Sequence, residues 1–309
     1  MKKYDIAVLI PCHNEECAIA KVIEDFRAAL PDARIYVGNN ASTDKTAEIA
    51  KSKSVALITE TRKGKGFMLR KMFSDIEAEI YVMVDGDATY DAKAAPVLIE
   101  HLIDNSYDYV NAARVTSQDS AYRSGHRFGN FMFSKMIEVF FGKNFTDILS
   151  GYKVFNRRFV KSFPCLSDNF EIETELAIYA LSEKLPIGEV KTNYVSRPEG
   201  SHSKLSTYKD GIKILSLIFY LIKTEKPMLF FTTLSLISAL IAIILTIPLF
   251  ITFFETGLVP KMPTAILVMG IYTISFVLFI TGIILDSFSN AQKELRRINY
   301  LNLAPLVKK

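Results

Sequence analysis

The sequence predicts an α/β domain with a mostly parallel sheet, followed by an interfacial helix and a hairpin of two transmembrane helices. Up to about residue 210, short apolar runs alternate with stretches of helical periodicity, which is the pattern of a parallel sheet. Two stretches without charged residues, 228–254 and 263–285, then follow. Each is longer than the roughly 20 apolar residues with which a helix crosses a bilayer.

The first 210 residues begin with a strand. Ile6–Ile10 is a continuous apolar run that ends at Pro11, as expected for a strand buried on both faces. Apolar residues at helical spacing follow over 15–30. Later strands are expected at 34–37, 55–58 and 80–84, and later helices at 66–76 and from a cap at Ser42 or Thr43 to about Lys51. Because parallel strands end at the same edge of a sheet, we expect a ligand site at their carboxyl ends.

The sequence changes character after residue 210. Residues 212–223 are apolar except for a polar side chain at every third or fourth position. A helix with such a narrow polar stripe fits the membrane interface, just before the first span. We therefore predict four parts, which are a domain at 1–210, an amphipathic juxtamembrane helix at 211–227, two transmembrane helices at 228–285 and a basic tail at 286–309.

The charges around the spans predict their orientation. The connection at 255–262 has one basic residue, Lys261, whereas the tail after Asp286 has several. Because basic residues favour the cytosolic side, we expect a protein of the cell membrane with its large domain and both termini in the cytosol. The apolar run near the N-terminus is too short for a signal peptide. The spans carry no acidic or basic side chain, so we interpret the hairpin as an anchor rather than an ion pathway, and contact between copies of the chain stays open.

Composition argues against several classes of protein. The formal net charge of +4 over 309 residues is small, and the chain has no nucleic-acid recognition motif. The 4 histidines and 3 cysteines have no zinc-site spacing and no C-x-x-C pair. No G-x-S-x-G elbow is present either, so a hydrolase triad is not predicted.

The clearest local motif is Asp85-Gly86-Asp87, directly after an apolar strand. On an extended chain, residues two apart point to the same face, and Gly86 allows close approach of a ligand to the backbone. Two carboxylates at the end of a strand suit Mg²⁺ or Mn²⁺ held together with substrate phosphates. The alternative is a solvated turn that closes a hairpin.

Three basic clusters accompany this motif. Arg62–Gly66 lies at the start of a helix, and the free N–H groups there suit a phosphate. The segment lacks the spacing of a P-loop, which argues against an ATPase. The alternative is a solvated basic turn. The segment 197–204 combines Arg, Ser and Lys around a glycine, as in a polyanion-binding loop. Arg123, His126 and Arg127 precede an apolar helix, which fits a membrane surface or a lipid phosphate; a core helix with solvated ends is the alternative.

A set of short strings matches a known family. They are IPCHNEE (10–16), STDKT (42–46), KGKG (63–66), DGDATY (85–90), GHRFGN (125–130), DILSGYKVF (147–155), FEIETEL (170–176) and RPEGSHSKL (197–205). By their number and order, the chain resembles glycosyltransferase family 2 enzymes of the GT-A fold. Within that family it resembles specifically the polyprenyl-phosphate glycosyltransferases related to dolichyl-phosphate mannose synthase, and the resemblance covers nearly all of residues 5–226.

The resemblance implies a nucleotide-sugar donor, a polyprenyl-phosphate acceptor and a Rossmann-like GT-A catalytic domain. The donor-binding residues that it implies are Pro11, Asn14, Glu15, Asn39, Lys65, Asp85, Arg197, Ser203 and Lys204. Relatives usually have Asp where this chain has Asn39, which can hydrogen-bond a base or ribose but carries no charge. A UDP-sugar is the preferred donor, and Asp85 and Asp87 would bind Mg²⁺ or Mn²⁺.

The resemblance also implies residues for the reaction and the acceptor. Its catalytic candidates are Asp87, Asp147 and Arg127. Its candidates for the lipid phosphate are Arg114, Arg123 and Arg127, and Glu171 and Glu173 would face the sugar or the acceptor. Whether Asp147 acts as a base or orients a substrate stays open.

Elementary chemistry agrees with this reaction. A phosphate monoester has a second pKa of about 6, so the acceptor is largely ionised at pH 7 without a base. The enzyme would then position the reactants in line, with inversion at the anomeric carbon, and offset charge on the leaving diphosphate. A neutral lipid such as diacylglycerol would instead need a base, and Asp147 is the candidate. A catalytically silent membrane scaffold is a further alternative, whereas a processive polysaccharide synthase is disfavoured because the chain has no Trp for a Q-x-x-R-W motif.

Overall fold

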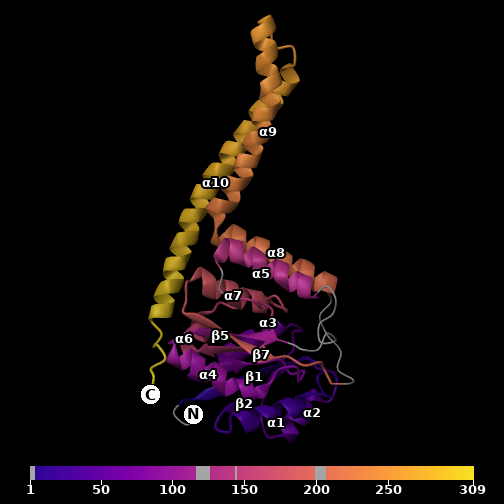
Figure 1. Cartoon of the computed structure of the whole chain (residues 1–309), viewed down its shortest axis with the longest axis vertical. Helices are drawn as coiled ribbons and strands as arrows, with labels where there is room; N and C mark the ends of the chain where they lie inside the picture. The colour runs from indigo at the N-terminus through magenta and orange to yellow at the C-terminus, as the bar shows by residue number, and fades with distance from the viewer. Residues whose placement is uncertain (1–3, 116–125, 143–144, 199–206) are drawn as a thin grey trace. The chain divides into compact units, whose positions relative to one another are not determined.

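The computed structural model describes residues 4–115, 126–142, 145–198 and 207–309 (Figure 1). The chain divides into two compact units. The first, Met1–Ile218 with Arg296–Lys309, we call the α/β unit; the second, Phe219–Leu295, we call the hairpin unit.

The α/β unit is built on one sheet. Among the described residues it has seven strands in the order β3-β2-β1-β4-β6-β5-β7. Their bounds are β1 Ile6–Cys12, β2 Arg34–Asn40, β3 Ala56–Glu60, β4 Ile80–Met83, β5 Tyr109–Val115, β6 Lys153–Asn156 and β7 Ile187–Asn193. β6 is antiparallel to both of its neighbours, and the other pairs are parallel. This confirms the predicted α/β class with a mostly parallel sheet.

Helices cover both faces of this sheet. Those of the α/β unit are α1 Ile19–Ala29, α2 Thr46–Ser52, α3 Lys65–Asp75, η1 Ala92–Ala94, α4 Ala95–Asp104, α5 His126–Phe141, α6 Arg157–Ser162 and α7 Ile172–Ser182. Figure 1 shows α1 and α2 on one side of the sheet and α7 on the other. β1 is buried on both faces because it is apolar throughout, and alternate residues such as Val8 and Ile10 join a core with α1 and α4.

The predicted cap of α2 is wrong. The helix begins at Thr46, and neither Ser42 nor Thr43 caps it. Both residues instead bind the loop after β1: the Ser42 hydroxyl accepts a hydrogen bond from the Asn14 amide (3.1 Å), and the Thr43 amide donates to Asn14 Oδ1 (2.7 Å). The Asp44 carboxylate accepts from the Thr46 amide (3.0 Å) at the start of the helix. Ser42 and Thr43 therefore form tertiary contacts with the loop after β1 instead of capping the helix.

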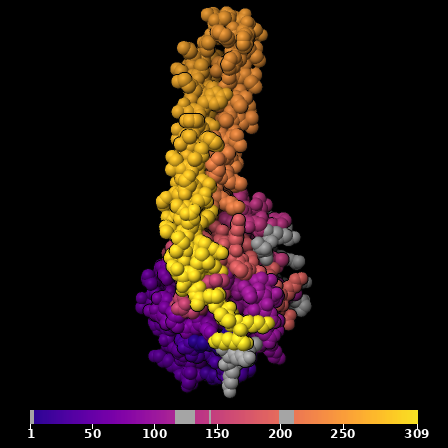
Figure 2. All heavy atoms as spheres, turned by 90° about the vertical axis from the view of Figure 1, so that its left-hand side faces the viewer, coloured from indigo at the N-terminus to yellow at the C-terminus, as the bar shows by residue number. Residues whose placement is uncertain are grey.

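The C-terminal residues 296–309 belong to the α/β unit, where the sequence indicated only a basic tail. Tyr300 is 4% exposed, and its hydroxyl donates a hydrogen bond to buried Asp108. The guanidinium carbon of Arg158 lies 4.0 Å from the centre of the Tyr300 ring. Farther along, Lys308 pairs with Asp104 at 2.8 Å. Figure 2 shows this C-terminal segment, in yellow, lying over the indigo and purple N-terminal half.

The last three helices are α8 Thr207–Glu225, α9 Pro227–Thr256 and α10 Met262–Leu301. α9 and α10 are long and apolar enough to cross a membrane. Inside the hairpin unit, the Ser235 hydroxyl donates to the Ser275 carbonyl (2.8 Å), and the Ser275 hydroxyl donates to the Ser235 carbonyl (2.9 Å). This reciprocal pair joins the two helices where apolar surface alone gives little attraction in lipid.

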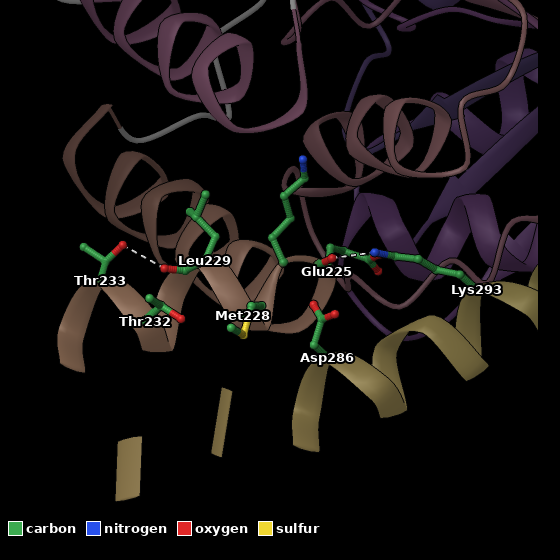
Figure 3. Close-up of a pocket in the computed structure, with 8 residues that line it drawn as sticks. Glu225, Met228, Leu229, Thr232, Thr233, Asp286 and Lys293 are labelled. Carbon is green, nitrogen blue, oxygen red and sulfur yellow. Dashed lines mark hydrogen bonds and ion pairs between the residues drawn. The ribbon is translucent and has the colours of Figure 1, made fainter. Parts of the chain in front are cut away.

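The hairpin unit has a pocket of about 600 Å³ next to the start of α9 (Figure 3). Met228, Leu229 and Thr232 line its apolar part, and Asp286 lies on the α10 side. The Lys293 ammonium donates to the Glu225 carbonyl at 2.5 Å and lies 3.8 Å from the Glu225 carboxylate. The polar ends of the helices are therefore joined by a charged contact at the edge of the apolar stretch.

Candidate active site

A pocket of about 430 Å³ lies at the carboxyl ends of β1, β2 and β4 in the α/β unit. The residues that line it come from several separate segments of the chain. They are Pro11 to Glu15 after β1, Asn40 at the end of β2, Lys63 to Lys65 at the start of α3, Asp85 to Asp87 with Tyr90 after β4, and Arg114, Leu149, Asn169, Phe170, Glu173, Tyr194 and Arg197 from later elements. The pocket thus lies at the sheet edge where parallel strands end, as the alternation of strands and helices predicts.

The loop after β1 forms one wall. Asn14 has a φ of 55°, a left-handed conformation that asparagine tolerates better than most residues. Its neighbours are fixed to the β2–α2 segment: the His13 ring nitrogen Nδ1 lies 2.7 Å from the Asn40 carbonyl, and the Glu15 amide donates to Thr46 Oγ1 at 2.8 Å. These contacts fix the position of the loop, whose residues line the pocket.

Asn40 connects this wall to the basic turn before α3. Its Oδ1 accepts from the Gly64 amide (2.7 Å), and its Nδ2 donates to the Arg62 carbonyl (2.7 Å). Asn39, by contrast, does not line the pocket, and its Oδ1 accepts from the Ser42 amide at 3.2 Å. Alternation along β2 explains the difference, because adjacent residues of a strand point to opposite faces.

Lys65 lies between two carboxylates. Its ammonium is 2.5 Å from Asp85 Oδ1 and 2.5 Å from Glu173 Oε1. Burial alone would lower the pKa of Lys65, but the charges and hydrogen bonds of the two carboxylates raise it above its usual value. Burial also raises the pKa of Glu173, against the effect of Lys65. This cation is therefore held in the pocket by two carboxylates that are distant in the sequence, one after β4 and one in α7.

Two glycines make room for this arrangement. A Cβ at Gly66 would lie 2.0 Å from the Ser167 carbonyl, so only glycine lets the start of α3 pack on the 166–168 segment. A Cβ at Gly151 would lie 2.1 Å from Asp85 Oδ2. Glycine at these two positions therefore places Lys65 and leaves space for the Asp85 carboxylate.

Asp87 is the more buried of the two motif carboxylates, at 3% exposed. Its Oδ2 lies 2.6 Å from the Arg197 guanidinium, and its Oδ1 accepts from the Thr89 hydroxyl at 2.6 Å. Burial raises the pKa of Asp87, the nearby charge of Asp85 raises it further, and Arg197 opposes both. The two motif carboxylates thus contact separate cations, Lys65 for Asp85 and Arg197 for Asp87.

A second ion pair lies at the end of β5. Arg114 binds the Asp147 carboxylate in a bidentate manner, with Nε 2.6 Å from Oδ2 and Nη2 2.8 Å from Oδ1, and the Arg114 amide donates to Oδ2 at 3.0 Å. Burial opposes ionisation of Asp147, but the charge and hydrogen bonds of Arg114 lower its pKa below the usual value. Asp147 is therefore a charged partner of Arg114, which lines the pocket.

Comparison with known proteins identifies the family. The model of the family described as glycosyl transferase family 2 matches residues 7–163, which include the loop after β1 and both carboxylates of the motif. The chain belongs to glycosyl transferase family 2. It is a glycosyltransferase, and its α/β unit has the GT-A fold.

Individual relatives agree with this assignment. This glycosyltransferase is 33% identical to glycosyltransferase AglJ of Haloferax volcanii over 228 residues. The aligned residues make up 73% of this chain and 75% of that protein. It is 26% identical over 210 residues to a dolichyl-phosphate hexose transferase of the same organism, 68% of this chain and 90% of that protein. Among solved structures, the chain is similar to the glucosyl-3-phosphoglycerate synthase of Mycobacterium tuberculosis in complex with Mn²⁺ and UDP-glucose. The match has a TM-score of 0.57 at 20% identity and covers 72% of this chain and 79% of that one. It shows a shared fold.

The structure brings together nine of the residues to which the resemblance assigns a role. Those that line the pocket of this glycosyltransferase are Pro11, Asn14, Glu15, Lys65, Asp85, Asp87, Arg114, Glu173 and Arg197, whereas Glu171 does not line it. Asp147 reaches it through Arg114, and Asn39 lies outside its lining. Arg123, Ser203 and Lys204 fall outside the described residues, as does the side chain of Arg127 in α5.

Part of the pocket lining is not marked by any motif in the sequence. Asn40 and Tyr194 were not singled out, and Tyr90 was noted only as the last residue of a matching string. The Tyr90 and Tyr194 rings pack edge to face with centres 5.2 Å apart, and the Tyr90 hydroxyl accepts from the Gly151 amide at 2.7 Å. No local signal favours Asn40 over Asn39 in β2, and none marks Tyr194, which the sheet brings to the pocket from the end of β7.

Proposed function

We propose that this glycosyltransferase moves one sugar from a nucleotide-diphosphate donor to a polyprenyl phosphate at the cytosolic face of a membrane. The observation that carries the proposal is the pocket itself, which combines the Asp85–Asp87 carboxylate pair, the cations Lys65 and Arg197, and a separate cation, Arg114. Such a site has groups for a metal-bound diphosphate and for a second anion. The relative named as a dolichyl-phosphate hexose transferase supports the acceptor, and the fold neighbour solved with Mn²⁺ and UDP-glucose supports a UDP-sugar donor.

The donor set fits a divalent metal shared with the substrate. Asp85 and Asp87 both line the pocket, and no group of three or more acidic, histidine or cysteine side chains suited to a metal occurs among the described residues. Hard cations such as Mg²⁺ bind through one or two carboxylates and complete their coordination with phosphates and water. Asp85 and Asp87 would hold such an ion, which when bound would neutralise charge on the leaving diphosphate.

The remaining donor contacts follow from the walls of the pocket. We assign Pro11, Asn14 and Glu15 to the nucleoside, because the loop after β1 is fixed beside the carboxylates. Lys65 and Arg197 would leave the carboxylates for the diphosphate when the metal and the nucleotide bind together. The ion pairs of Asp85 and Asp87 would then be replaced by metal–carboxylate and cation–phosphate contacts, while Lys65 keeps its contact with Glu173.

Arg197→Gln is expected to change two affinities in opposite directions. Without nucleotide, Mn²⁺ should bind this variant about tenfold more tightly, because Arg197 no longer competes for Asp87; a hydrogen bond to a charged group is worth about 1.5–3 kcal/mol. With Mn²⁺ present, UDP should bind at least about tenfold more weakly, because a phosphate contact is lost. Isothermal titration calorimetry of the full chain in detergent measures both affinities.

Arg157→Gln, at an exposed pair with Glu77, is the matched control and should change neither affinity. Loss of both affinities in Arg197→Gln would show that Arg197 does not compete with the metal.

The acceptor chemistry needs positioning more than proton transfer. An ionised phosphate oxygen of the lipid attacks the anomeric carbon, the bond from that carbon to the diphosphate oxygen breaks, and its electron pair leaves with the nucleoside diphosphate. Attack opposite the leaving group inverts the anomeric centre. We assign Arg114 to the acceptor phosphate, because it lines the pocket and its guanidinium is oriented by Asp147. Arg123 and Arg127 remain further candidates for the same phosphate.

Competition between acceptors tests this assignment. Full-length protein in detergent is given a labelled nucleotide sugar with equal amounts of polyprenyl phosphate and diacylglycerol. We expect label on the polyprenyl phosphate, because its nucleophile is already ionised. Label on diacylglycerol would make Asp147 a candidate base, and absence of nucleotide binding would favour a silent scaffold.

The helices α9 and α10 suit an enzyme whose acceptor is a membrane lipid. We propose that they form a two-span anchor with the α/β unit and both termini in the cytosol, as the basic residues near the spans favour. Cross-linking in membranes tests whether copies of the chain contact one another through this anchor.

A further inference from the structure

A network of buried polar side chains joins three strands to the segment that carries Asp147. Lys153 on β6 is fully buried. Its ammonium donates to the Tyr109 hydroxyl at 2.8 Å, to Asn111 Oδ1 at 2.8 Å and to the Ile148 carbonyl at 3.3 Å. An ammonium has three donors, and these three acceptors satisfy them. Burial lowers the pKa of Lys153 to about 8, which still leaves the group mainly protonated at pH 7.

Asn111 on β5 connects Lys153 to the backbone of Asp147. Because its Oδ1 accepts from Lys153, its Nδ2 faces the other way and donates to the Asp147 carbonyl (2.8 Å) and to Glu189 Oε1 (2.8 Å). Asn111 and Glu189 are also register partners in the β5–β7 pair. The orientation of the Asn111 side-chain amide is therefore fixed by Lys153 on one side and by Asp147 and Glu189 on the other.

Glu189 on β7 holds the same segment from its N-terminal side. Its carboxylate accepts from the Thr146 amide (2.9 Å), from the Thr146 hydroxyl (2.7 Å) and from the Asp147 amide (3.4 Å). Asn111 holds the Asp147 carbonyl, so both peptide groups of Asp147 are bound to side chains from the sheet. The Asp147 carboxylate is then directed at Arg114 at the end of β5.

We propose that Lys153, Asn111 and Glu189 are positioning residues. They hold the Asp147 backbone, so that its carboxylate keeps the Arg114 guanidinium in the orientation that binds the acceptor phosphate. The inference rests on the proposed function, in which Arg114 contacts that phosphate. A long arginine side chain has many rotamers, and fixing it before the acceptor binds avoids an entropic cost at the moment of binding.

The kinetic test compares two replacements of Glu189 in the full-length protein. Leucine is of similar size but accepts no hydrogen bond, whereas glutamine keeps an acceptor oxygen at the same place. For Glu189→Leu we expect the acceptor KM to rise about 10- to 100-fold, the usual effect of losing a supporting contact, with the donor KM unchanged. Glu189→Gln should restore most of the acceptor affinity. Asp104→Asn, at an exposed pair with Lys308, is the control and should behave like the wild type. Equal effects of Glu189→Leu on both KM values, or lower thermal stability with unchanged kinetics, would overturn the inference.

A second measurement does not depend on the acceptor. Glu189 reaches Arg114 through Asp147, so the shifts in unfolding temperature caused by Glu189→Leu and Arg114→Gln should not add in the double variant. Additive shifts would overturn the positioning role. If the wild type transfers no sugar to polyprenyl phosphate, the proposed function fails, and this cycle still decides whether the network positions Arg114.

Discussion

Asp87→Asn is expected to reduce sugar transfer by at least about 1,000-fold, the upper range for loss of one preorganised electrostatic contact in an active site. Asp87 is 3% exposed and lies 2.6 Å from Arg197. The amide keeps the shape of the side chain and the hydrogen bond from Thr89, but it removes the charge that would bind the metal. Initial rates at saturating donor and acceptor measure the effect.

A matched control lies four residues away. Asp91 follows the same strand, and its carboxylate accepts from the Lys93 amide at 2.9 Å, but it does not line the pocket. Asp91→Asn should therefore keep a rate close to that of the wild type. If Asp87→Asn retains more than about a tenth of the wild-type rate, a change of under 1.4 kcal/mol in the barrier, the assignment of Asp87 to the metal and diphosphate is wrong.

Lys65→Met is expected to destabilise the α/β unit by about 3–5 kcal/mol at pH 7, the usual cost of removing one partner from a buried ion pair. Lys65 contacts both Asp85 and Glu173 at 2.5 Å, and methionine leaves these two carboxylates without their shared cation. Urea unfolding of the full chain in detergent, followed by circular dichroism, measures the loss. Lys63→Met, at an exposed position in the same turn, should cost under about 0.5 kcal/mol.

The loss in Lys65→Met should become smaller as the pH falls. Burial already raises the pKa of Glu173 in the folded protein, and removal of Lys65 raises it further. Between the unfolded and folded pKa values, the folded state binds more protons at this group, so stability increases as the pH is lowered through that range. The double variant Lys65→Met/Glu173→Gln should recover part of the stability at pH 7. A loss that is independent of pH and not recovered in the double variant would contradict the buried-charge explanation.

The sequence predicted those parts of the fold that depend on local patterns. The continuous apolar run in β1 marked a strand buried on both faces, and the charge-free stretches marked α9 and α10. The Asp85–Asp87 motif followed an apolar strand, and its position at the pocket followed from the strand order. The strand, the charge-free stretches and the motif are each encoded in one contiguous segment of the sequence.

Features that join distant parts of the chain could not be predicted in the same way. β6 inserts antiparallel between β4 and β5, and no local pattern fixes its direction. Glu173 is 108 residues from Lys65 in the sequence, and the two meet only because α7 packs beside the pocket. Similarly, Tyr300 is 192 residues from Asp108, and its burial depends on the return of the chain after α10. Tertiary packing decides such contacts, as it does the choice between Asn39 and Asn40.

Transfer of a sugar to a polyprenyl phosphate can be measured in membranes by following a radiolabel from the donor into the lipid. Membranes with the full-length protein receive Mg²⁺ or Mn²⁺, polyprenyl phosphate and, one at a time, radiolabelled nucleotide sugars. We predict that label from one donor enters the organic phase, and that EDTA and Asp87→Asn each abolish this transfer. Label that stays in the aqueous phase with every donor, while the nucleotide still binds, would contradict the claim and point to another acceptor.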